Sequence, residues 1–91
     1  MQTETQVRSP VAVGDLVVFT DQHGIEHAAL LTNVFDNGDQ VAKPDPTVNV
    51  AYVSGDGART DSYGRQLERA TSVCHQSKST VKGNTWRRLD D

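Results

Sequence analysis

The sequence predicts an all-β domain, a small barrel of about five strands. Two observations lead to this prediction. In residues 13–35, an apolar run, a polar turn and a longer apolar run follow one another, which is typical of a β-hairpin. Residues 47–53 then alternate, with Val48, Val50 and Tyr52 on one face and Asn49 and Ala51 on the other.

The strands can be assigned in order along the chain. Gly24 in the first turn supplies the positive φ that a tight reversal needs. We expect a first strand over 15–20, a second over 26–35, a third over 47–53, a fourth over 69–74 and a short closing strand over 85–89. Turns are expected at 21–24 and 36–39, and a flexible loop at 54–61. The inward positions predict a core of Val17, Phe19, Leu31, Val34, Val48, Val50 and Tyr52.

Ninety-one residues are enough for one small domain, with a single core and no large internal cavity. Apolar residues concentrate between Val11 and Val53. We therefore expect a flexible N-terminal arm over 1–9, the barrel over 10–76 and a C-terminal tail over 77–91. No apolar stretch approaches the roughly 20 residues of a membrane span, so no membrane partner is expected.

The formal charge of −3 is unevenly distributed along the chain. Residues 15–61 hold eight acidic and two basic residues, a charge of −6, whereas residues 62–91 hold six basic and three acidic residues, a charge of +3. Either the chain has an ordinary mixed surface, or its basic third docks on an acidic partner or on a second copy.

The sequence contains no convincing catalytic, metal or cofactor motif. His23, His27, His75 and Cys74 are the candidate soft-metal ligands, but they lack the paired spacing of a zinc site. Gly55-Asp-Gly57 lacks the third glycine and the following helix of a dinucleotide loop. Cys74 and His75 are neighbours in a strand and point to opposite faces. We expect no catalytic residue, no metal, no cofactor and no small-molecule substrate, and hence no enzyme.

Basic residues with interleaved aromatic residues occupy the C-terminal third, which leaves a nucleic-acid-binding module open as an alternative. The acidic remainder and a pI near 5.5 argue against it. We expect a protein partner instead, because tryptophan and arginine are common interface anchors. The predicted partner-binding residues are Tyr63, Arg65, Trp86, Arg87 and Arg88.

The hairpin over 13–35, together with Val50-Ala-Tyr-Val-Ser-Gly-Asp56 and Asp61-Ser-Tyr-Gly-Arg65, resembles small SH3-like proteins encoded by tailed viruses of bacteria and archaea. The resemblance spans residues 13–75 and lies in the layout. It implies an SH3-like barrel with a structural role in a virion, such as capsid decoration, cementing or a place in the head–tail region. It carries no site residues across.

The expected function is therefore a non-enzymatic virion accessory subunit that binds capsid or other virion subunits, or a second copy of itself. Its expected location is the virion, and otherwise the host cytoplasm. A third hypothesis, a chromatin-reader-like peptide binder, has weak support from five scattered aromatic residues: Phe19, Phe35, Tyr52, Tyr63 and Trp86.

Overall fold

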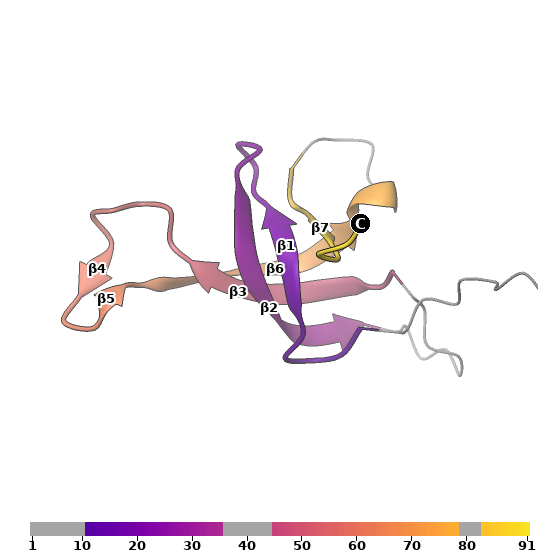
Figure 1. Cartoon of the computed structure of the whole chain (residues 1–91), viewed down its shortest axis with the longest axis horizontal. Helices are drawn as coiled ribbons and strands as arrows, with labels where there is room; N and C mark the ends of the chain where they lie inside the picture. Colours follow the sequence, from indigo (N-terminus) through magenta and orange to yellow (C-terminus); the bar gives the residue numbers. More distant parts are fainter. Residues whose placement is uncertain (1–10, 36–44, 79–82) are drawn as a thin grey trace, which may run out of the picture.

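The computed structural model describes residues 11–35, 45–78 and 83–91, and these residues form an all-β domain (Figure 1). Strands make up 56% and helix 4% of the described chain, which confirms the predicted fold class. The expected N-terminal arm and the expected turn over 36–39 lie outside the described residues.

Five strands form a closed barrel in the order β1-β2-β3-β6-β7. Their bounds are Leu16–Thr20 (β1), Glu26–Phe35 (β2), Thr47–Val53 (β3), Leu67–His75 (β6) and Thr85–Arg87 (β7). A separate two-stranded sheet pairs β4 (Thr60–Asp61) with β5 (Gly64–Arg65), and one turn of 3₁₀ helix, η1, spans Gln76–Lys78. Neighbouring barrel strands pair antiparallel except β6 and β7, which are parallel. The arrangement is consistent with an SH3-like layout.

Two irregularities bend the long strands so that the sheet can close. The β2–β3 register shifts between Leu31 and Asn33, and the β3–β6 register shifts after Val48. Near the second shift Ser72 has a φ of +54°, and its backbone N–H donates to the Asn49 side-chain oxygen at 2.9 Å. Such bulges increase twist and bend a strand, which is how a short sheet curls back on itself.

Eight apolar residues fill the barrel interior: Val17, Phe19, Ala29, Leu31, Val48, Val50, Val73 and Trp86. Five of the seven predicted core residues are among them. The other two, Val34 and Tyr52, are partly buried and pack against the cluster. Ala29, Val73 and Trp86 complete the core and were not in the predicted set.

Residues 54–66 form a hairpin that extends away from the barrel, with β4 and β5 at its far end (Figure 1). The expected loop over 54–61 is thus one arm of an ordered hairpin. Its base is fixed by the buried Ser54, whose hydroxyl donates to a Glu68 oxygen at 2.6 Å and accepts the Asp56 N–H at 3.1 Å. Its tip carries Tyr63, which is 98% exposed.

Strand β7 belongs to the barrel, which corrects the expected division into a barrel over 10–76 and a tail over 77–91. β7 fills the gap between β1 and β6 and closes the sheet. Just before β7, Gly83 has a φ of +89°, and a Cβ there would lie 2.5 Å from the Asp21 backbone oxygen. Glycine lets the chain pass this close to the β1–β2 turn before it enters the sheet.

Candidate protein-binding surface

The five residues predicted to bind a partner do not form one surface. Tyr63 and Arg65 lie on the projecting hairpin, whereas Trp86, Arg87 and Arg88 lie in and after β7, on the other side of the barrel (Figure 1). Arg65 bends back along the hairpin, and its Nη1 donates to the Ser54 backbone oxygen at 3.0 Å.

Trp86 is completely buried and is not an exposed anchor. It stands opposite Phe19 in the β1–β7 ladder and faces the interior, where its Nε1–H donates to the Pro46 carbonyl at 2.9 Å. The Arg88 guanidinium lies over the indole, 5.3 Å from its centroid, and forms an ion pair with Asp45. The sequence suggested an interface anchor because tryptophan suits both roles. The pairing of β7 with β1 makes it a core residue.

His75, Ser77 and Asp91 form a hydrogen-bonded group next to Trp86. His75 is 3% exposed; its Nδ1 accepts the Ser77 backbone N–H at 3.2 Å and lies 2.8 Å from the Ser77 hydroxyl oxygen. Its Nε2 therefore carries the proton and donates to an Asp91 oxygen at 2.8 Å. This group places the Ser77 hydroxyl and the Asp91 carboxylate on the two ring nitrogens of His75, and Nδ1 is shared between that hydroxyl and a backbone N–H. It fastens residue 91 and η1 to the barrel.

The outside of the sheet carries a continuous apolar surface. We call it the outer face, and its members are Leu16, Val18, Ala28, Leu30, Ala51, Val53 and Leu67. Strand register joins them: Leu16 pairs with Leu30, Leu30 with Ala51, and Val53 with Leu67. Leu16 and Leu30 are each 50% exposed, and Leu67 is 68% exposed. Leucine pairs on the solvent side of a sheet are typical of a surface that another protein covers.

The sequence contained a signal for this surface. Each of the first three strands contains four consecutive apolar residues: 16–19, 28–31 and 50–53. A strand with one face in water alternates, whereas a strand covered on both faces is apolar throughout. Alternation marks the buried face of a strand and not a second apolar face, so the predicted core residues do not include the outer face.

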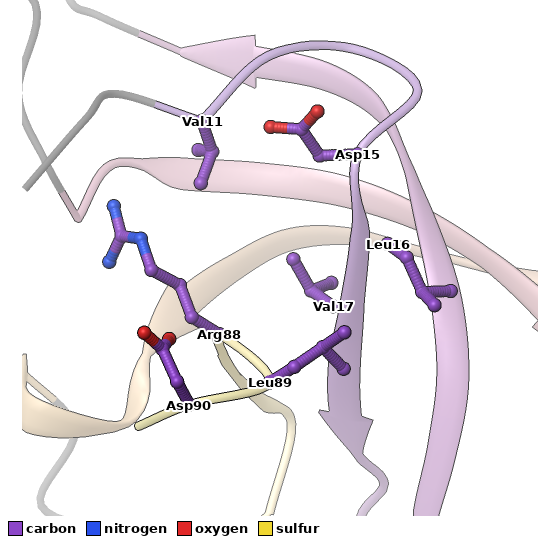
Figure 2. Close-up of a pocket in the computed structure, with 7 residues that line it drawn as sticks. All are labelled: Val11, Asp15, Leu16, Val17, Arg88, Leu89 and Asp90. Atoms are coloured by element: carbon purple, nitrogen blue, oxygen red, sulfur yellow. The ribbon is translucent and has the colours of Figure 1, made fainter.

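A hollow of about 360 Å³ adjoins the outer face at Leu16 (Figure 2). Its apolar lining is Val11, Leu16, Val17 and Leu89, and the last of these stands on the turn that follows β7. Asp15, Arg88 and Asp90 line the same hollow. An apolar side chain of a partner could enter here while the charged groups stay in contact with water.

A second hollow, of about 380 Å³, lies at the end of the barrel where the β1–β2 turn meets the loop after β3. We call it the His27 pocket; its lining is Asp21, His23, Ile25, His27, Tyr52, Gly55 and Asp56. His27 Nε2 lies 2.8 Å from an Asp21 oxygen, and the other Asp21 oxygen accepts the backbone N–H groups of His23 and Ile25. These bonds lower the Asp21 pKa to about 2, with the His27 contact as the largest cause. Asp21 is therefore ionised at neutral pH.

The remaining sequence candidates are dispersed. Cys74 is exposed on β6, while its neighbour His75 is buried. Among the described residues no group of three or more histidine, cysteine, aspartate or glutamate side chains could hold a metal ion. Within the same part of the chain, no helix is long and apolar enough to cross a membrane. No protein-family model, curated protein or solved structure matches this chain.

Proposed function

We propose that this protein is a non-enzymatic structural subunit that binds neighbouring protein subunits through the outer face. The observation that carries the proposal is the pairing of half-exposed leucines, Leu16 with Leu30, in the middle of an apolar sheet surface. The proposed setting is a virion, as a capsid decoration or cementing subunit or in the head–tail region. When it is not in the particle, the chain would lie in the host cytoplasm.

The size of the outer face suits this role. Complete burial of a leucine or valine side chain stabilises an assembly by about 1.5–3 kcal/mol, so covering the exposed half of each contributes about 1 kcal/mol. The four exposed side chains are Leu16, Leu30, Val53 and Leu67. Together with Ala28, Ala51 and a contact from the hairpin, they form the centre of an interface of ordinary size, which buries about 800 Å² per partner. Tyr63 and Arg65, at the end of the hairpin, are proposed as a second contact.

Nucleic acid is the less favoured partner. Among the described basic side chains of the C-terminal third, Arg87 contacts Glu26 at 3.4 Å, Arg88 contacts Asp45, and Lys78 contacts the Asp45 backbone oxygen at 2.7 Å. Arg65 lies on β5 and Arg69 on β6, so they are on different elements from Lys78, Arg87 and Arg88. A nucleic-acid module needs an open basic stripe to displace counterions from phosphates, and this distribution does not favour one.

The test is co-sedimentation of the tagged chain with virus particles purified by density gradient from cells that encode it. The unaltered chain is expected in the particle fraction, and the double variant Leu16→Lys/Leu30→Lys in the soluble fraction. Gln22→Lys/Gln76→Lys is the matched control, because it adds the same charge at exposed positions outside the outer face. Equal particle binding by both double variants, or absence of the unaltered chain from particles, would refute the proposal.

A further inference from the structure

The His27 pocket combines aromatic ring faces with carboxylates at one open end of the barrel. Tyr52 forms a cluster with two other rings: its centroid is 4.7 Å from that of His27 and 4.9 Å from that of Phe19, with interplanar angles of 39° and 38°. Phe19 is buried, whereas His27 and Tyr52 line the hollow. The face of a tyrosine ring carries negative potential and attracts cations.

The charges around the pocket are acidic. Asp21 and Asp56 line it, and no lysine or arginine is among its lining residues. The pKa of Tyr52 is raised, first by burial and then by the negative charges of Glu68 and Asp21, against a smaller opposing effect of Arg59. The tyrosine ring therefore lies in a region of negative potential, which favours a cation and disfavours a phosphate or a carboxylate.

The walls of the pocket are held in place by the fold. Asp21 is bonded through both oxygens, and it fixes the His27 ring through Nε2. Gly55 closes one side, where a Cβ would lie 3.5 Å from the His27 Cε1 atom. Asp56 is held by the Ala58 backbone N–H, which donates to Oδ1 at 2.9 Å. Pre-formed walls reduce the ordering cost of binding.

We propose that the His27 pocket binds an organic cation, the guanidinium or ammonium group of a basic side chain on a partner protein. The cation lies against the Tyr52 and His27 rings, and Asp56 and Asp21 supply the opposing charge. This site is separate from the outer face, and it is tested on the isolated chain, so its failure would leave the proposed function intact.

The experiment is a ¹H–¹⁵N nuclear magnetic resonance titration of the whole chain with N-acetyl-arginine amide. We expect saturable shifts of the Ile25, His27 and Gly55 amides, with a dissociation constant on the order of 1 mM, since small ligands gain about 0.3 kcal/mol per non-hydrogen atom. N-acetyl-citrulline amide has the same shape without the charge, and it should give no saturable shift. N-acetyl-lysine amide, with a free ε-ammonium group, shows whether the site accepts both cations.

Asp56→Asn removes one pocket charge while its amide oxygen can still accept the Ala58 N–H. It should weaken arginine amide binding about three- to tenfold, the effect of one charge at roughly 5 Å in a partly screened site. Asp61→Asn is the matched control: Asp61 accepts the Tyr63 N–H at 2.8 Å in the same kind of turn, on the hairpin and outside the pocket. Equal affinities of the two variants, shifts with the citrulline compound, or no saturable shift would overturn the proposal. Tighter binding of a free cation such as tetramethylammonium than of either side-chain analogue would assign the site to a small molecule.

Discussion

The projecting hairpin over 54–66 and the C-terminal segment over 83–91 differ in a way that composition does not indicate. Both contain glycine, arginine and one large aromatic residue. Tyr63 of the hairpin is 98% exposed, whereas Trp86 of the C-terminal segment is fully buried. The difference lies in strand pairing, because β7 pairs with two barrel strands while β4 and β5 pair with each other. Long-range pairing therefore decides which aromatic residue stabilises the fold.

The largest expected effect is at Trp86. Trp86→Ala should destabilise the domain by about 3–5 kcal/mol, because it leaves a cavity opposite Phe19 and removes the hydrogen bond to Pro46. Deletion of residues 77–91 should abolish folding, since the barrel would lack β7. Chemical denaturation followed by circular dichroism measures both effects. A deletion variant that melts cooperatively, like the full chain, would show that this segment is a tail after all.

The next largest effect is expected where the hairpin joins the barrel. Ser54 is 1% exposed, and Ser54→Ala removes both its hydrogen bond to Glu68 and its bond with the Asp56 N–H. Loss of a buried polar partner costs about 1–3 kcal/mol. Ser62→Ala, at an exposed position in the hairpin turn, is the control and should leave the unfolding midpoint unchanged. Equal midpoints for the two variants would mean that the base of the hairpin contributes nothing to stability.

A smaller, pH-dependent effect is expected at Asp21, on the turn against which Gly83 packs. Its folded-state pKa, about 2, lies below the ordinary value of 3.8. The stabilisation by this carboxylate is therefore complete above about pH 4 and is lost as the pH falls towards 2. The difference in melting temperature between the unaltered chain and Asp21→Asn should shrink over this range. A difference that stays constant from neutral pH to pH 2 would contradict the lowered pKa.

The smallest effect is expected at the hairpin tip. Tyr63→Ser should change the free energy of unfolding by less than about 0.5 kcal/mol, because the side chain is almost fully in water. Thermal unfolding of this variant and of Trp86→Ala under the same conditions compares how much each region contributes to the stability of the fold. A loss above about 1 kcal/mol would mean that the tip contacts the barrel.

The sequence was sufficient for the all-β class and for strands whose signal is local. The second and third strands were predicted with the bounds that the structure shows, because alternation and turn residues mark them. The role of β7 was harder to predict: three residues give no usable periodicity, and Trp86 is fixed by pairing with a strand far away in the sequence. For the same reason, of the partner-binding residues predicted in and after β7, Trp86 lies in the core, and Arg87 borders the outer face through its pairing with Val18.

The proposed contact between the outer face and neighbouring subunits can be tested by photo-crosslinking in purified particles. A p-benzoylphenylalanine residue at position 30 lies in the middle of the outer face, and one at position 76 lies on η1, an exposed position outside it. We expect an adduct with a particle subunit from position 30 and none from position 76, identified by mass spectrometry. Adducts of equal yield from both positions, or none from position 30 in particles that contain the chain, would contradict it.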